Sequence, residues 1–194
     1  FYRSYLKNKK ESLPFVTAKI AISKDLFTIN NKSKFITNEF SRGRVHYMRS
    51  SHDCIITSAT TVNKDNPSLT CRIPGLKKRS PDIIIFDKDL KIVKNSKLLF
   101  SNKRNLIIIF NNKINKKNIN YLKKRKIKLL KFPLNNTGNF NLKKILSKIK
   151  MLGYSRVFLE SGTNLMTNFL KDDLINDFKI FISSKKLGKN GKNS

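Results

Sequence analysis

Cysteine is scarce in this sequence, and long apolar runs are missing. The two cysteines, Cys54 and Cys71, do not make a disulfide framework, and neither a CxxC pattern nor a His/Cys cluster indicates a metal site. The longest apolar runs, such as residues 105–110, are far too short to span a bilayer. Residues 1–12 lack the apolar segment and cleavage site of a signal peptide. We therefore expect a reducing, cytoplasmic environment, with no metal and no membrane association.

Acidic residues are also few, with 12 Asp and Glu against 42 Lys and Arg and a formal net charge of +30. Such an excess is typical of polyanion binders. The lysines are nevertheless spread along the whole chain, with one modest cluster at 121–131, whereas a nucleic-acid surface usually concentrates them among exposed aromatics. We favour a compositional bias toward lysine, asparagine and isoleucine, and we do not expect a nucleic-acid partner. The positive field would still favour a phosphorylated substrate.

The residues that are present suit a globular domain. With 194 residues, of which 39% are hydrophobic, the chain can bury one sizeable core. Apolar, β-branched runs alternate with stretches of helical periodicity, which indicates a three-layer α/β domain. We expect strands at 14–23, 53–59, 82–86, 105–110, 126–132, 155–160 and 177–183, helices at 37–51, 115–126, 139–154 and 165–175, and a loop at 62–75.

The helix expected at 37–51 has a recognisable start and an apolar stripe. Either Thr37 or Asn38 can cap its first turn. Three apolar side chains are expected to face the core, namely Phe40, Val45 and Met48.

One strand–turn–helix unit, at 157–170, carries chemistry of its own. Glu160 ends an apolar strand, the small residues Ser161 to Thr163 form the turn, and a helix opens directly afterwards. Amide groups at a helix start, approached closely beside a glycine, form an anion site that suits a phosphate. Many such turns are simple connections, so this unit alone does not assign a function.

Several segments, taken in order, resemble the reductase domain of the bifunctional riboflavin-biosynthesis deaminase/reductase family. They are LPFVTAKIAIS, SKFIT, RGRVHYMRSSHDCIITSATTVNKDNPSLTCR, VFLESGTNL and KIFISSKKLG, and residues 49–72 carry the most specific part. The resemblance implies a dihydrofolate-reductase-like α/β/α fold with a mostly parallel sheet. It also implies NADPH-dependent reduction of the ribosyl group of 5-amino-6-(5-phosphoribosylamino)uracil to a ribityl chain.

The same resemblance implies a division of the chain. Residues 1–12 resemble the linker that follows the deaminase domain, whose zinc motif is absent here, and residues 13–194 resemble the reductase domain. The family continues with further strands beyond the position of Gly188, so we expect those C-terminal strands to be missing. The full-length protein is expected to carry a covalently linked deaminase domain and to form a homodimer, as the family does.

Site residues are carried over from the family position by position. The implied cofactor-binding residues are Ala21, Phe35, Thr61, Asp65, Lys88, Gly162, Thr163, Asn164, Leu165, Met166, Thr167 and Asn168. The implied substrate-binding residues are Ser33, Arg49, Leu69, Arg72 and Glu160, and the candidates for proton transfer are Lys19 and Asp65. Phe35 stands where the family has a tryptophan, and the family's VEGG is LESG here, so a serine replaces the first glycine.

The chemistry of this family gives each residue type a task. Arg49 and Arg72 would grip the substrate's 5′-phosphate with forked donors. Glu160 would accept hydrogen bonds from the pyrimidine, and the loop that contains Pro67 would place Asp65 and Arg72 on opposite sides of one cleft. Taken singly, each residue also has a structural interpretation: a helix-end cation, a turn former or a helix cap. His46 and His52 are expected on the surface or a helix flank rather than in catalysis.

Two other functions remain open at this stage. The chain could be a different dihydrofolate-reductase-like enzyme that acts on another pterin or pyrimidine. It could alternatively be a basic RNA-binding domain, which would bind RNA in a salt-dependent manner without regard to NADPH.

Overall fold

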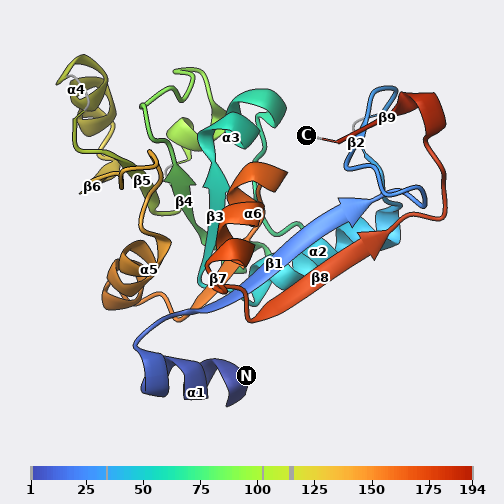
Figure 1. Cartoon of the computed structure of the whole chain (residues 1–194), viewed down its shortest axis with the longest axis horizontal. Coiled ribbons are helices and arrows are strands. Elements are labelled where there is room, and N and C mark those ends of the chain that lie inside the picture. Colours follow the sequence, from blue (N-terminus) through green and yellow to red (C-terminus); the bar gives the residue numbers. More distant parts are fainter. Residues whose placement is uncertain (1, 34, 102, 114–115, 194) are drawn as a thin grey trace.

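The computed structural model describes residues 2–33, 35–101, 103–113 and 116–193 (Figure 1). Its centre is a seven-stranded sheet with the order β6-β5-β4-β3-β7-β1-β8, in which every neighbouring pair is parallel. The strands are β1 (Phe15–Ile22), β3 (Cys54–Ser58), β4 (Asp82–Phe86), β5 (Leu106–Asn111), β6 (Lys128–Phe132), β7 (Arg156–Leu159) and β8 (Asp177–Ile182). A small antiparallel pair joins β2 (Ile29–Asn30) to β9 (Gly191–Lys192).

Helices connect the strands and cover both faces of the sheet. The α-helices are α1 (Tyr2–Glu11), α2 (Glu39–Ser50), α3 (Ala59–Asp65), α4 (Lys116–Lys124), α5 (Leu142–Met151) and α6 (Thr163–Lys171). Short 3₁₀ turns lie at η1 (Lys77–Arg79), η2 (Lys97–Phe100) and η3 (Gly188–Asn190). The prediction of an α/β domain with three layers and a mostly parallel sheet is confirmed, and all seven strands expected from the sequence are present.

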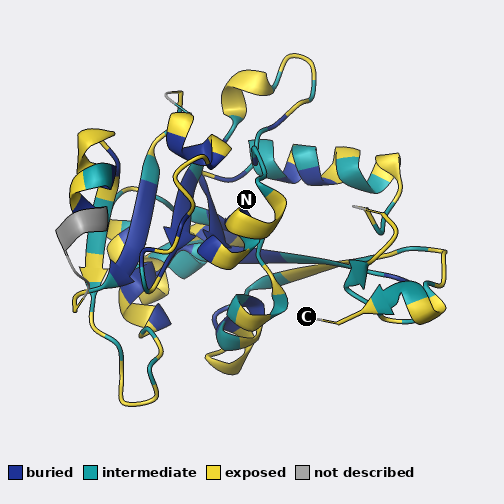
Figure 2. Ribbon diagram, turned by 90° about the horizontal axis from the view of Figure 1, so that it is seen from above, coloured by how far each residue is buried: buried dark blue, intermediate teal, exposed yellow. Residues whose placement is uncertain are grey.

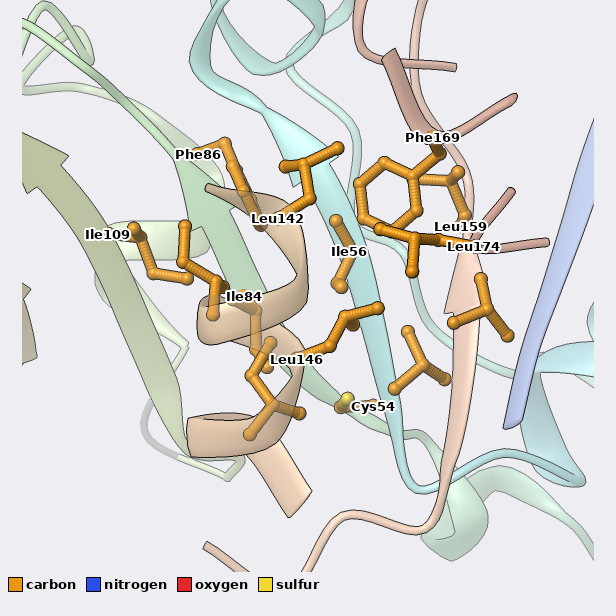
Figure 3. Packing of buried hydrophobic residues seen from close by; sticks show 14 of the residues in the cluster. Cys54, Ile56, Ile84, Phe86, Ile109, Leu142, Leu146, Leu159, Phe169 and Leu174 are labelled. Atoms are coloured by element: carbon orange, nitrogen blue, oxygen red, sulfur yellow. The ribbon is translucent and has the colours of Figure 1, made fainter. Parts of the chain in front are cut away.

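One face of the sheet is closed by α5 and α6. Figure 3 shows Leu142 and Leu146 of α5 lying over the strand residues Ile56 and Ile84, with Phe169 of α6 beside them. These five side chains are at most 3% exposed. Burying a leucine, isoleucine or phenylalanine contributes about 1.5–3 kcal/mol each, so this periodic face explains why the sequence predicted α5 well.

The other face is closed by α2, α3 and α4. Val45 and Met48 of α2, Val62 of α3 and Leu122 of α4 join one buried cluster with the second face of the strands. Figure 2 shows the resulting pattern, in which burial is concentrated in the central strands and the outer helix faces are exposed. The isoleucine-rich strands β4 and β5 are buried on both faces, as expected for a parallel sheet covered by two helical layers.

Three expectations about element boundaries need correction. Phe40 is 92% exposed, so it does not belong to the buried stripe of α2, whose N-cap is Asn38. The stretch 62–75 is not all loop, because α3 continues to Asp65 before Asn66 ends it in a left-handed conformation at φ 40°. The last predicted helix, 165–175, begins earlier at Thr163 and ends at Lys171.

The segment expected as a linker is mostly a helix. Arg3 of α1 donates to the carbonyl of Asn176 at 3.2 Å, and Asn8 donates to the carbonyl of Ser155 at 3.3 Å. These contacts hold α1 against the amino ends of β7 and β8, the two strands that flank β1 in the sheet.

Candidate active site

The carboxyl ends of β3 and β7 lie side by side, because these strands are neighbours in the parallel sheet. Each strand runs directly into a helix, β3 into α3 and β7 into α6. In open parallel sheets, ligands bind beyond this edge, close to helix starts. The candidate site therefore lies at this edge of the sheet.

A hydrogen bond couples the two helix starts. The amide of Gly162, the N-cap residue of α6, donates to Oγ1 of Thr61 in the first turn of α3 at 3.0 Å. Ser58 caps α3 by accepting the Thr61 amide at 3.2 Å. Gly162 has an ordinary φ of −67°, and a Cβ added there would meet Thr61 Oγ1 at 3.5 Å. Neither backbone strain nor a close contact therefore requires a glycine at this position.

The hydroxyl of Ser161 is an unusual feature of this turn. Its Oγ is buried and has no hydrogen-bond partner within the part of the chain that the structure describes. A buried hydroxyl without a partner is costly, and such groups are often satisfied by a ligand. Ser161 was not among the predicted site residues, although its position, where the family pattern has a glycine, was a signal for it.

Arg49 and Glu160 form the strongest polar contact of the site. Arg49 Nε donates to Glu160 Oε2 at 3.0 Å, and Nη2 donates to Oε1 at 2.8 Å. The two side chains are only 12% and 17% exposed. Arg49 Nη1 also donates to the carbonyl of Thr70 at 3.0 Å. Sequence reasoning assigned the forked donors of Arg49 to a phosphate, whereas the structure directs them to a carboxylate.

This pairing keeps Glu160 ionised. Burial raises the pKa of Glu160, but the charge and the hydrogen bonds of Arg49 outweigh it and hold the pKa below its ordinary value, with Lys19 and His46 acting in the same direction. Glu160 is therefore a carboxylate at neutral pH, and its oxygens keep lone pairs beyond those that Arg49 uses.

His46 belongs to the same cluster and was missed by sequence reasoning. Its Nδ1 lies 2.8 Å from the carbonyl of Thr70, and because a carbonyl only accepts, Nδ1 carries the proton. Burial, together with the charges of Arg49 and Arg72, lowers the pKa of His46. Arg72 is exposed and follows Thr70 by two residues, and the carbonyl of Thr70 is the group that His46 and Arg49 both contact.

Lys19 faces the same side as Glu160. Ala18 pairs with Leu159 in the β1–β7 register, and both side chains are buried in the cluster under α5 and α6. Because side chains alternate along a strand, Lys19 and Glu160, one position further on, both face the α2 side. Ala21, two residues beyond Lys19, shares that face and is half-buried.

Other predicted residues surround this centre or lie apart from it. Ser33 and Phe35 are exposed in the segment between β2 and α2, where the Arg42 guanidinium stacks 4.6 Å from the Phe35 ring centre. Asp65 is exposed at the end of α3, and Lys88 is exposed just beyond β4.

Two predicted contact residues are core residues instead. Leu69 is 4% exposed and takes a left-handed conformation at φ 49°, which turns its side chain into the cluster under α2 and α3. Met166, a residue of α6, is 2% exposed and packs in the cluster between the sheet and the helices α5 and α6. Neither side chain is available to a ligand in this structure, so any ligand contact at these two positions would have to involve the backbone. His52, expected near the surface, is also buried, at 8% exposure.

A family comparison decides the assignment of the fold. The family described as the RibD C-terminal domain matches residues 14–194. The chain belongs to the RibD C-terminal domain family. In the described residues, no helix is long and apolar enough to cross a membrane, and no group of three or more side chains could hold a metal ion.

Curated relatives share this domain. The riboflavin biosynthesis protein RibD of Aquifex aeolicus is 33% identical over 177 residues, covering 90% of this chain and 48% of the relative. A Debaryomyces hansenii protein named 2,5-diamino-6-ribosylamino-4(3H)-pyrimidinone 5′-phosphate reductase is 28% identical over 207 residues, covering 98% of this chain and 83% of the relative. The chain thus spans about half the length of the RibD relatives it matches.

Solved structures agree with this assignment. RibD of Acinetobacter baumannii superposes with a TM-score of 0.81 at 21% identity, covering 98% of this chain and 51% of that one. The Saccharomyces riboflavin biosynthesis reductase Rib7 superposes with a TM-score of 0.73 at 25% identity, covering 99% and 86%. The fold implied by the resemblance is confirmed by these superpositions.

Proposed function

We propose that this chain reduces the ribosyl group of 5-amino-6-(5-phosphoribosylamino)uracil to the ribitylamino product with NADPH, a step of riboflavin biosynthesis. The observation that carries the proposal is the ionised Glu160. This residue lies two positions before the N-cap of α6, and Arg49 holds its carboxylate in place. It sets a pyrimidine-binding acceptor beside a helix start suited to a phosphate. The names of the D. hansenii and Saccharomyces relatives support the same reaction class.

The turn between β7 and α6 fits the phosphates of the cofactor. Helix geometry leaves the first amides of α6 without acceptors inside the helix, and the positive end of the helix dipole favours an anion there. The orphaned hydroxyl of Ser161 adds a buried donor, and Thr61 fixes the position of Gly162. Thr163 and Asn164 belong to the first turn of α6 and Thr167 and Asn168 to its second turn, whereas Leu165 and Met166 pack on the core and would contribute only through their backbone.

The substrate would lie between Glu160 and Arg72. The lone pairs left on the Glu160 carboxylate would accept hydrogen bonds from N–H groups of the pyrimidine. Arg72, exposed beside His46, would bind the 5′-phosphate with its forked donors. Arg49 would act by orienting Glu160 rather than by gripping the phosphate.

The protein's own contribution is mainly to orient both partners and exclude water. The cofactor supplies the hydride, which C1′ of the opened ribosylamine accepts. A proton must reach the substrate during ring opening and reduction. Lys19, an ammonium on the face shared with Glu160, is a candidate donor, and Asp65 is the second candidate.

The proposal extends to the protein that contains this domain. The RibD relatives are about twice as long, and the Thermotoga maritima relative is named as a deaminase and a reductase, which supports a covalently linked deaminase domain. A cytoplasmic location remains part of the proposal. Exposed apolar side chains on the edge strand β8 support a homodimer, namely Phe178, Ile180 and Ile182.

A steady-state assay tests the proposed reaction. The purified chain is mixed with NADPH and the ribosylaminouracil phosphate, and oxidation of the nicotinamide is followed by absorbance. We expect oxidation that depends on this substrate and exceeds that seen with dihydrofolate. Turnover of dihydrofolate without turnover of the ribosylaminouracil phosphate would assign a different reductase.

A further inference from the structure

A basic cavity lies at the opposite edge of the sheet from the proposed active site. Its lining includes Leu106 and Lys128, the first residues of β5 and β6, and Tyr154 just before β7. Because the sheet is parallel, these amino ends lie on the edge away from Glu160. The cavity measures about 730 Å³, which is within the size range of small-molecule sites. In Figure 1, β5 and β6 also lie at the far end of the sheet from β8.

The Asp82 carboxylate accepts hydrogen bonds from two lining residues, Asn105 and Tyr154, at 2.8 Å each, but the charged residues that line the cavity are basic. Five cations line it, and no aspartate or glutamate does so among the described residues: Arg104, Lys124, Arg125, Lys126 and Lys128. Clustered cations at a concave surface focus a positive field and attract anions. Four of the five come from the basic run at 121–131 that the proposed reaction leaves unused.

The two arginines are held in place. The Arg125 guanidinium lies 4.1 Å from the ring centre of Phe100, and its Nε donates to the hydroxyl of Tyr121 at 2.9 Å. Arg104 donates to the carbonyls of Ser68, at 2.6 Å, and Leu69, at 2.9 Å. These contacts fix both charges before any ligand arrives, which lowers the entropy cost of binding.

Lys126 occupies a backbone position that favours glycine. The amide of Lys126 donates to Lys123 O at 2.9 Å and the amide of Ile127 donates to Leu122 O at 3.3 Å, a glycine-type helix end, with Lys126 at φ 59°. Favourable contact with the helix dipole explains cations in the last turn of α4, but not a lysine in this left-handed position or Lys128 on β6.

The floor of the cavity is apolar. Leu106 and Leu152 line the cavity and are only half-buried, so they provide its accessible apolar surface, whereas Leu98, Ile107 and Ile127 are buried at 2%, 2% and 9% exposure. A small inorganic anion would leave this floor uncovered. A ligand that contains both a phosphate and a flat ring would fit the cations and the apolar floor, since rings stack on tyrosine and on guanidinium planes.

We propose that this cavity is a second ligand site, distinct from the reductase centre, that binds a free nucleotide with its phosphates on Lys124, Lys126 and Lys128 and its ring over the apolar floor. The site would bind nucleotide whether or not the chain is a reductase.

Photolabelling with 8-azido-ADP tests the site by location. After irradiation, labelled peptides of the full chain are mapped by mass spectrometry. We expect label within 98–107, 121–128 or 152–154, and competition by unlabelled ADP. Label confined to other segments, such as 160–168, would overturn the proposal. Protection by a short single-stranded RNA at lower concentration than by ADP would contradict a free nucleotide as the ligand.

Matched charge variants separate a site from bulk charge. The triple variant Lys124→Gln, Lys126→Gly, Lys128→Gln should lose roughly tenfold or more of the labelling, equivalent to a tenfold weaker affinity. The control variant substitutes glutamine at three lysines on the exposed face of α5, Lys143, Lys144 and Lys148, and should stay within about twofold. An equal loss in both variants would overturn the proposal.

Folding is controlled within the same experiment. Lys126→Gly relieves a left-handed lysine, so its melting temperature should be at or above that of the parent chain. If the triple variant does not fold, the pair Lys124→Gln and Lys128→Gln replaces it with the same expected loss. Reductase activity is not measured, so failure here leaves the proposed reaction standing, and absence of reductase activity leaves this site standing.

Discussion

Arg49 and Glu160 are 111 residues apart in the chain, yet two parallel hydrogen bonds join them, Nε to Oε2 at 3.0 Å and Nη2 to Oε1 at 2.8 Å. The contact ties α2 to the end of β7 and orients the carboxylate at the start of the α6 turn. Its energetic role and its functional role can be separated by experiment.

Breaking this pair should destabilise the fold. Arg49→Met leaves a largely buried carboxylate without its partner and should cost about 2–4 kcal/mol, whereas Arg49→Met with Glu160→Gln should cost less than the sum of the two single changes. Urea denaturation measures these free energies of unfolding. The exposed pair Lys91–Asp89 provides the control, because Lys91→Met should cost less than about 0.5 kcal/mol. Additive effects at Arg49 and Glu160 would show that the two do not interact.

Arg72 is expected to bind the substrate phosphate. Arg72→Ala should raise the substrate KM roughly tenfold or more and leave cofactor affinity nearly unchanged, because the lost contact lies on the substrate side. Arg79→Ala, which removes an exposed arginine from the following 3₁₀ turn, should leave both values close to those of the parent chain. An unaltered KM in Arg72→Ala would remove Arg72 from the phosphate site.

Ser161 is expected to serve the cofactor rather than the fold. Its hydroxyl is buried without a partner in the described structure, so Ser161→Ala should not destabilise the ligand-free fold and should raise its free energy of unfolding by about 1–3 kcal/mol. NADPH binding, measured by calorimetry, should weaken by about five- to tenfold through the loss of one hydrogen bond. The control is Ser96→Ala, since the Ser96 hydroxyl is also buried without a partner but lies in the segment before η2. Equal NADPH affinity in the parent chain, Ser161→Ala and Ser96→Ala would contradict the placement of the cofactor beside Ser161.

His52 should make stability fall in mild acid. Its Nδ1 lies 2.6 Å from the carbonyl of Met48, and burial lowers its pKa below 6.5. The unfolded chain therefore binds a proton at a higher pH than the folded chain, and stability is lost as pH falls below about 6.5. His52→Asn keeps a donor near Nδ1 without titrating, so its unfolding free energy should vary less between pH 7.5 and 5, as denaturant titrations at about these values would measure. An unchanged pH dependence would exclude this group.

Asp25 should hold the C-terminal segment to the β1–β2 connection. Its carboxylate accepts from Ser23 Oγ at 2.6 Å and from the amides of Leu187, at 3.0 Å, and Gly188, at 2.8 Å. The Ser23 hydroxyl and the Leu187 amide lower its pKa to about 2, so this contact should persist above pH 3.8 and be lost as pH falls through about 2. Asp25→Asn should speed hydrogen exchange at Leu187 and Gly188, while Asp172→Asn, an exposed aspartate after α6, should not. Unchanged exchange in Asp25→Asn would show that the Asp25 carboxylate does not hold the C-terminal segment.

The strands were predictable because their physical cause is local. Ile83 to Ile85 and Ile107 to Ile109 are continuous apolar, β-branched runs, which form strands that are buried on both faces wherever they sit in a parallel sheet. Their order was not predictable. That β7 inserts between β3 and β1 depends on packing across the whole sheet, and it is this order that brings Gly162 beside Thr61.

The candidate site was predicted in part. The small-residue turn before α6 identified the helix start, and its glycine shares a hydrogen bond with Thr61. The partner of Arg49 could not be read from the sequence, because the contact is long-range. The burial of the Leu69 side chain was not predicted, because a left-handed leucine is uncommon and no local signal showed that the backbone would turn its side chain inward.

Sequence reasoning did not find the end of α3, for a related reason. Only Ala59 and Val62 of that helix are buried, and the residues Asn63 to Asp65 are polar, so no apolar periodicity extends to its end. The cap at Ser58 and the left-handed Asn66 define the helix instead.

The most direct test of the account is a crystal structure of this chain with NADPH and the reduced product bound. The account predicts the cofactor phosphates on the first amides of α6 beside Ser161, the pyrimidine hydrogen-bonded to Glu160, and the ribityl phosphate on Arg72. A cofactor bound away from the β7–α6 turn, or a pyrimidine out of reach of Glu160, would contradict it.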